Sequence, residues 1–319
     1  MKLKQIYQLA LEMGVKADPR TKKGVQKALD KQKRKYQALS KNEKELFDKE
    51  KLKNPYSDTR LLFGDETKRI KTILAGIDID GAEILLAHKL SETKPIDLVL
   101  SHHPLGQALA NLDEVMHLQT DLLYEICAVP INIAEGVLKE RIAQVRRSLA
   151  PVNHQQTVDA ARLLNMPLMC VHTPVDNLVY QFVAKLVERK KPDTVGEIID
   201  LLLNIPEYKK AAELSAGPTI FVGEKDNRAG KIVLSEMTGG TNANKEIYEK
   251  MAQAGVGTII SMHMADEHRL EAQKYHLNVV IAGHIASDSL GMNLFLDELE
   301  KVGVKVIPCS GLIRIKRKK

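Results

Sequence analysis

The chain of 319 residues is 44% hydrophobic but only 4% aromatic and contains no tryptophan, so its core must be built from aliphatic side chains. It contains no stretch of about 18 apolar residues and begins without a secretory signal, which predicts that it has no membrane partner. Its cysteines, Cys127, Cys170 and Cys309, form no C-x-x-C motif, which argues against a disulfide framework or a cysteine-rich zinc site and favours a cytoplasmic location.

The net charge of +6 is unevenly distributed along the chain. Residues 1–60 contain 17 Lys and Arg against 8 Asp and Glu, whereas residues 61–313 are acidic, with a net charge of −8. The C-terminal tail is again basic, with Arg314, Lys316, Arg317, Lys318 and Lys319. Nucleic acid is therefore a candidate partner for the basic ends rather than for the whole chain.

The first 60 residues are expected to form a basic helical extension. Val25, Leu29, Tyr36 and Leu39 make a thin apolar stripe among many lysines, at a spacing that indicates helix. Three roles fit this extension: a solvated helical hairpin, an arm that packs on another subunit, or an element that binds nucleic acid.

From about Arg69 onward, short apolar runs alternate with amphipathic segments. Strands are predicted over residues 73–77, 96–100, 130–133, 168–171, 220–222, 231–235, 258–261, 279–282 and 304–308. Helices are predicted over residues 82–90, 119–127, 156–164, 178–188, 195–203, 244–253, 267–275 and 290–301. This alternation predicts an α/β fold with largely parallel strands. A buried strand that ends in histidine recurs in the two parts of the chain, which suits two similar halves facing each other.

Four of the predicted strands lead directly into histidine, and these account for five of the ten histidines, namely His102, His103, His172, His263 and His284. In open α/β sheets ligands bind beyond the carboxyl ends of the strands, so these side chains are expected to converge. His263 is a candidate for contacting substrate or for supporting a neighbouring ligand.

The adjacent histidines are the strongest of these signals. Successive side chains of a strand point to opposite faces, so His102 and His103 can converge only where the strand ends. Pro104 supplies that end and holds His103 in an extended conformation. Each imidazole could then bind one ion of a pair, and the alternative is two hydrogen-bonded histidines at a turn.

An H-x-x-x-D motif occurs twice after apolar runs, at His172–Asp176 and at His284–Asp288. Residues four apart on a helix share one face, so each motif can direct an imidazole and a carboxylate at the same ion. This donor set suits Zn, Mn, Fe, Co or Ni better than Ca or Mg. Two such ions, roughly 3.5–4 Å apart, would activate water and stabilise an oxyanion.

A glycine loop follows the strand predicted over residues 231–235. Gly239, Gly240 and Thr241 lie between that strand and a predicted helix, where backbone N–H groups could bind the phosphate of a substrate. A plain tight turn explains the same residues. Asp78 and Asp80 follow another strand and could lie at the same edge of the sheet, or cap a helix.

Three segments together resemble the NGG-one-interacting-factor-three-like family, whose members are often labelled GTP cyclohydrolase type 2 homologs. They are the run 97–105 with His102-His103-Pro104-Leu105, the segment 172–176 and the segment 283–288. The resemblance covers roughly residues 65–315. Asp78 and the glycine loop also fall where the family has an aspartate and glycines.

The resemblance implies two similar α/β lobes with a dinuclear metal site between them. The lobes would be residues 61–165 plus the C-terminal part, and residues 166–319, and the family tends to form hexamers. The ligand positions match His102, His103, Asp176 and His284, while Asp288 stands where the family has glutamate. Residues 1–60 and a stretch around 107–150 have no counterpart in the family pattern.

Three functions are compatible with these features. The first is a metal-dependent hydrolase for a nucleotide or related small substrate, with two divalent cations per subunit and with His172 or His263 moving protons. The second is a non-catalytic metal-binding regulatory or scaffold protein. The third is a nucleic-acid-associated protein that uses its basic ends.

Overall fold

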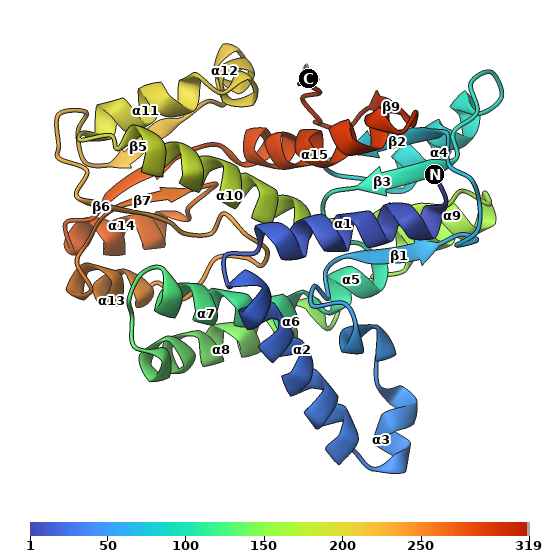
Figure 1. The fold of residues 1–319 in the computed structure, drawn as a ribbon, viewed down its shortest axis with the longest axis horizontal. Coiled ribbons are helices and arrows are strands. Elements are labelled where there is room, and N and C mark those ends of the chain that lie inside the picture. Colours follow the sequence, from blue (N-terminus) through green and yellow to red (C-terminus); the bar gives the residue numbers. More distant parts are fainter. Residues whose placement is uncertain (318–319) are drawn as a thin grey trace.

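The computed structural model describes residues 1–317 and contains two separate β-sheets flanked by helices (Figure 1). Lys318 and Lys319 of the basic tail lie outside the described residues. The first sheet has the order β1-β4-β3-β2-β9, in which β1 is antiparallel to β4 and the other neighbours are parallel. Its strands are β1 Arg60–Phe63, β2 Thr72–Gly76, β3 Leu98–Ser101, β4 Leu168–Cys170 and β9 Lys305–Pro308.

The second sheet repeats this plan with the order β5-β8-β7-β6. Its edge strand β5 is antiparallel to β8, and the remaining neighbours are parallel. Its strands are β5 Thr219–Val222, β6 Lys231–Leu234, β7 Val256–Ser261 and β8 Asn278–Ile281. The prediction of an α/β fold with two similar lobes is therefore confirmed.

Both faces of the first sheet are buried, as expected for a mainly parallel sheet. Side chains alternate along β2, so Ile73 and Ala75 pack on one face and Leu74 on the other. The face of Leu74 is covered by α4 Gly81–Leu90 and α9 Gln156–Leu163. The opposite face is covered by α1 Leu3–Ala17 and by the end of α15 His284–Lys301.

The second sheet is likewise covered on both faces. One face packs on α11 Val195–Leu203 and α12 Pro206–Glu213, and the other on α13 Ile247–Gln253 and α14 Asp266–Lys274. The stretch 107–150 is helical and contains α5 Gly106–Ala110, α6 Leu112–Val115, α7 His117–Glu125 and α8 Ile131–Leu149. Its helices α7 and α8 join the core on the side of α13 and α14.

The strand predicted over residues 130–133 is wrong, because α8 begins there. Pro130 is the N-cap residue, and Ala134 and Leu138 continue the apolar pattern at helical spacing into the core. A short apolar run cannot distinguish a strand from the first turn of a buried helix.

Two long helices connect the lobes by crossing from one to the other. Helix α10 Thr173–Lys190 begins directly after β4 of the first sheet, yet its Val179 and Val183 pack in the core of the second lobe. Helix α15 begins after β8 of the second sheet, and its Phe295 and Leu299 pack in the core of the first lobe. The two helices lie side by side (Figure 1). The lobes are thus held together by the exchange of these helices.

The N-terminal 60 residues are helical and play two different structural roles. Leu3, Ile6 and Ala10 of α1 are buried in the core of the first lobe. By contrast, α2 Thr21–Ala38 and α3 Lys41–Leu46 project from the body (Figure 1). The short helix Lys49–Leu52 leads back to the body, where Glu50 accepts from the Tyr7 hydroxyl at 2.8 Å. This projecting arm packs on itself through Tyr36 and Phe47, whose rings are 5.0 Å apart. Across residues 1–317, every helix is too short or too polar to cross a membrane.

The contact between α10 and α15 depends on Gly291, and this generates a first prediction. A methyl group at Gly291 would lie 2.5 Å from the carbonyl oxygen of Val175, so the helices would have to separate. We expect Gly291→Ala to lower the free energy of unfolding by about 1–3 kcal/mol, measured by urea denaturation.

The control is Gly136→Ala in α8, where the added methyl would meet no atom within 4 Å among the described residues. This substitution should raise the free energy of unfolding by about 0.5–1 kcal/mol, because alanine favours helix over glycine. Equal effects of the two substitutions would contradict the close approach of α10 and α15.

Candidate metal centre

The carboxyl ends of the parallel strands of both sheets meet at one place between the lobes. His102 and His103 follow β3, His172 follows β4, and His263 and His284 follow β7 and β8. Ring centroids are 5.2 Å apart for His102 and His103, 5.1 Å for His102 and His172, 5.2 Å for His103 and His284, and 4.9 Å for His263 and His284. The structure therefore brings together all five histidines that were predicted at strand ends.

Two carboxylates enter this group from the first turns of the crossing helices. Asp176 Oδ1 lies 3.3 Å from His102 Nε2, and Asp288 Oδ1 lies 3.5 Å from the same atom. Asp288 Oδ2 lies 3.5 Å from the Nε2 atoms of both His103 and His284. We call this set the His–Asp cluster, and its members are His102, His103, His172, Asp176, His284 and Asp288.

The histidines that end β3 are held so that one ring nitrogen of each faces the cluster. The backbone N–H groups of His102 and His103 donate to carbonyls of residues 76 and 77, which prolongs the parallel pairing past β3. His102 Nδ1–H donates to the Val171 carbonyl at 3.0 Å, and His103 Nδ1 is 2.6 Å from Asp78 Oδ1. Anchoring of Nδ1 leaves Nε2 free to act as a donor atom, as in histidines that bind metals.

The residues of the cluster fit a divalent cation. Buried polar atoms in proteins normally have hydrogen-bond partners, yet His102 Nε2, Asp176 Oδ1 and both carboxylate oxygens of Asp288 have none within residues 1–317. In each of three groups of residues, the donor atoms all lie within 4.8 Å of one another. The groups are His102 with His103 and His172, His103 with His284 and Asp288, and His102 with Asp176 and Asp288. Imidazole and carboxylate donors suit a divalent transition metal.

The electrostatics of the cluster favour positive charge at its centre. Burial alone would lower the pKa of His102, but Asp288 and Asp176 outweigh it and raise that pKa well above its usual value. Burial would likewise raise the pKa of Asp288, yet the neighbouring imidazoles hold it far below its usual value. Toward the surface, burial and then His284 lower the pKa of His263 to about 4, and burial lowers the pKa of His284.

Asp58 is part of the site although the sequence reasoning did not identify it. It is fully buried, and its Oδ2 accepts from His172 Nδ1 at 2.7 Å and from Thr173 Oγ1 at 2.6 Å. The Thr59 hydroxyl accepts from the backbone N–H of His172 at 3.0 Å. Because β1 runs antiparallel to its neighbour, its beginning lies where the other strands end, so a search of strand ends alone overlooks Asp58.

The glycine loop borders the cluster on the side of the second lobe. A small cavity of about 20 Å³ lies here, and the residues that border it include His172, Asp176, His284 and Asp288 of the cluster, His263, Gly240 and Thr241. Gly239 instead packs on the start of α10, where an added Cβ would lie 1.6 Å from Thr173 Oγ1.

The helix predicted from residue 244 begins at Ile247. Asp80 caps α4 by accepting from the Ala82 N–H.

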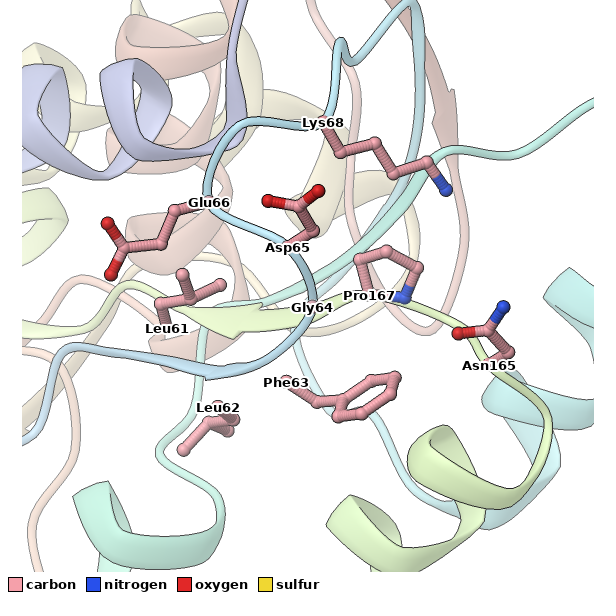
Figure 2. A pocket seen from close by; sticks show the side chains of 9 residues that line it. All are labelled: Leu61, Leu62, Phe63, Gly64, Asp65, Glu66, Lys68, Asn165 and Pro167. Carbon is pink, nitrogen blue, oxygen red and sulfur yellow. The ribbon is translucent and has the colours of Figure 1, made fainter.

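A larger hollow of about 740 Å³ lies elsewhere, along β1 and the turn that follows it (Figure 2). It is bordered by Phe63, Gly64 and Pro167. Pro167 precedes β4 whereas His172 follows it, so the hollow is at the opposite end of the strand from the cluster. Glu66 at its edge pairs with Lys4, and the hollow contains no histidine among its described lining residues. The candidate site is therefore the small cavity.

The buried hydrogen bonds of Asp58 lead to a second prediction. Asp58→Ala would leave the His172 Nδ1–H and the Thr173 hydroxyl without their buried acceptor, so we expect the free energy of unfolding to fall by at least about 2 kcal/mol. Asp65→Ala is a matched control, because the exposed Asp65 also accepts two hydrogen bonds, both from Thr67. Thermal denaturation should separate the two variants, and a stable Asp58→Ala protein would refute the structural role of Asp58.

The complete fold is similar to known structures. It matches a NIF3 superfamily protein from Sphaerobacter thermophilus over 97% of this chain and 98% of the other, with a TM-score of 0.74 and 28% identity. It also matches the fold of reduced HcgD from Methanocaldococcus jannaschii over 79% of this chain and 88% of the other, with a TM-score of 0.52 and 15% identity. No protein-family model and no curated protein matches the sequence. The chain is thus a structural relative of the NIF3 superfamily over nearly its whole length, which confirms the resemblance predicted from its sequence motifs.

Proposed function

We propose that this protein is a hydrolase that holds two divalent cations per subunit and acts on a nucleotide or a related small substrate. One observation carries the proposal: four buried donor atoms, on His102, Asp176 and Asp288, face each other without hydrogen-bond partners among the described residues. Such an arrangement is costly in a folded protein unless a cation completes it.

The ligands we propose are His102, His103, Asp176, His284 and Asp288. Asp288 is suited to a bridging role because its two oxygens are each 3.5 Å from imidazole nitrogens on different sides of the cluster. The donor types are compatible with Zn, Mn, Fe, Co or Ni. When bound, such cations lower the pKa of water and stabilise negative charge on the group under attack.

The burial of the cluster indicates where substrate would approach. The His102, Asp176 and Asp288 side chains are buried, whereas the side chain of His284 is 41% exposed. We therefore place the substrate on the side of His284 and His263. The low pKa of His263 keeps its imidazole neutral near pH 7, so it can hydrogen-bond to a substrate or leaving group.

The other predicted roles remain part of this proposal. Gly240 and Thr241 border the cavity, where their backbone could contact a substrate phosphate, and Gly239 supports the loop through its packing on α10. His172, oriented by Asp58, is a candidate for proton transfer. A homohexamer is the assembly that the family resemblance implies, and the cysteine pattern favours a cytoplasmic location. A metal sensor or scaffold without catalysis is the alternative use of the same ligands.

The metal centre is tested by elemental analysis of the purified protein together with a nucleotide hydrolysis screen. We expect about two transition-metal ions per chain, and we expect Asp288→Ala and His102→Ala to lose metal and activity together. His88→Ala is the control, because His88 is exposed on α4. Less than about one ion per chain would refute the proposal, and bound metal without turnover would favour the sensor alternative.

A second function, nucleic-acid binding, is favoured by the surface of α2. Lys23, Lys27, Lys31, Arg34 and Lys35 recur at helical spacing and are all exposed, so they form one basic face. Val25 and Tyr36 lie on the opposite face, where Val25 is buried and Tyr36 packs against Phe47. A row of exposed cations on a projecting helix can follow the phosphates of a nucleic acid strand.

This second function is tested by measuring the binding of duplex DNA and single-stranded RNA at several salt concentrations. We expect Lys27→Gln/Lys31→Gln to weaken binding and to reduce the slope of log K against log salt by about 2. Lys185→Gln/Lys190→Gln, which removes the same charge from the exposed face of α10, should have no effect. Equal effects of the two double variants would show that binding is not specific to the arm.

A further inference from the structure

Glu236 lies at the same edge of the second sheet as His263 and His284. It follows β6, which is parallel to β7, and β7 is parallel to β8, so the residues after these three strands lie along one edge. Glu236, His263 and His284 all border the small cavity of the cluster. Glu236 was not a candidate in the sequence analysis because no histidine or H-x-x-x-D motif marks it.

The backbone and carboxylate of Glu236 are held in an unusual way. Its φ of 55° is in the left-handed region, which a residue with a side chain adopts at a cost of about 1 kcal/mol or more. Its Oε1 accepts from the Ala243 N–H at 2.8 Å. Its Oε2 is buried and has no hydrogen-bond partner among residues 1–317. Strain and an unpaired buried oxygen at one residue indicate a functional constraint.

A second unpaired acceptor comes from Gln119 of α7. The Gln119 amide Nε2 donates to the Thr241 carbonyl at 2.8 Å, which fixes the orientation of the amide. Its Oε1 is then the free end, and it is buried without a partner in the described chain. Gln119 borders the same cavity as Glu236.

The size and chemistry of this cavity suit a single water molecule. A volume of about 20 Å³ holds about one water, and a buried water needs two to four polar partners. Four residues that border the cavity carry unpaired buried acceptors, and those of Asp176 and Asp288 are the ones we assign to the cations. Water has two protons to donate, and Glu236 Oε2 and Gln119 Oε1 remain to accept them. The lone pairs of the water would then be directed away from these acceptors.

We propose that Glu236 and Gln119 hold the attacking water of the reaction and that Glu236 accepts its proton. The proposal rests on the hydrolase function proposed above. One hydrogen of the water is donated to Glu236 Oε2 and the other to Gln119 Oε1, so its oxygen faces the His–Asp cluster and the substrate. As the oxygen forms its bond to the substrate, Glu236 takes one proton. It returns this proton to the leaving group as that bond breaks, so the carboxylate is regenerated.

The protonation behaviour of Glu236 is consistent with this role. Burial raises the pKa of Glu236 to about 7, although the Ala243 N–H, the charge of Arg141 from α8 and the nearby Ser261 hydroxyl act to lower it. The proton of the Ser261 hydroxyl is donated to the His263 carbonyl, at 2.8 Å. Tyr248 of α13 is also close enough to be affected by its charge. The titratable groups that border the same cavity are His172, Asp176, His263, His284 and Asp288. A carboxyl group that titrates close to the operating pH is well suited to proton transfer. His172 is less available, because Asp58 engages one ring nitrogen and Asp176 faces the other.

The test compares Glu236→Gln with wild type and with Glu213→Gln, an exposed glutamate on α12. Glutamine keeps an acceptor for the Ala243 N–H but cannot take a proton. We expect Glu236→Gln to lower the turnover of the substrate found in the screen about 100-fold or more, with metal content and thermal stability unchanged. Gln119→Leu should lower turnover less. Activity of Glu236→Gln within about threefold of wild type would overturn the proposal.

A titration that requires no turnover separates this proposal from the hydrolase function itself. In protein labelled with ¹³C at glutamate carboxyls, one signal should titrate near pH 7 and be missing from Glu236→Gln but present in Glu213→Gln. Addition of Zn²⁺ should lower its midpoint, because a nearby cation favours the carboxylate. An absent signal, or a midpoint that Zn²⁺ leaves unchanged, would overturn the role of Glu236. Failure of wild type to bind metal would instead refute the hydrolase proposal.

Discussion

The structure is organised around two aspartates that are buried between the lobes. An isolated carboxylate placed in a protein interior costs several kcal/mol, and Asp176 and Asp288 both approach the same atom, His102 Nε2. They are compatible with the folded state only if positive charge lies between or beside them. The two sheets supply it from their strand ends, as imidazoles that can carry a proton or bind a cation. The lobes must therefore face each other with these edges together.

The two halves of the centre are built by one local plan with a few substitutions. His172 and Asp176 at the start of α10 correspond to His284 and Asp288 at the start of α15. The Ser101 hydroxyl donates to the His103 carbonyl at 2.8 Å, and the Ser261 hydroxyl donates to the His263 carbonyl at the same distance. Ser101 and His103 of the first lobe thus match Ser261 and His263 of the second. The residue between them does not match, because His102 of the first lobe has Met262 as its counterpart. The fully buried imidazole therefore comes from the first lobe alone, and the second lobe provides Glu236 beside the cavity.

The sequence alone was sufficient to predict the site residues that belong to a local motif. It was insufficient for the residues that only the arrangement of the strands and helices brings to the site. His102-His103-Pro104 and the two H-x-x-x-D motifs follow apolar strands, so their convergence could be predicted from the rule that parallel strands end at one edge. The starts of α10 and α15 were predicted several residues too late, because their first turns carry the polar site residues and break the apolar pattern. Asp58 comes just before an antiparallel strand, Gln119 lies on α7, and Glu236 lies in a strained turn. No local sequence motif marks any of the three residues.

The packing of the crossing helices also bears on the use of aspartate at position 288, where the sequence resemblance implies a glutamate. Gly291 lies one helical turn after Asp288, and its backbone contacts Val175, the neighbour of Asp176. The absence of a side chain at Gly291 thus sets how closely the first turns of α10 and α15 approach, and with them the two carboxylates. A shorter side chain needs a closer backbone to reach the same imidazoles, and Asp288 already lies 3.5 Å from nitrogens of three histidines. Helix packing and side-chain length are therefore matched, so a change at the helix contact would alter the His–Asp cluster without touching any of its members.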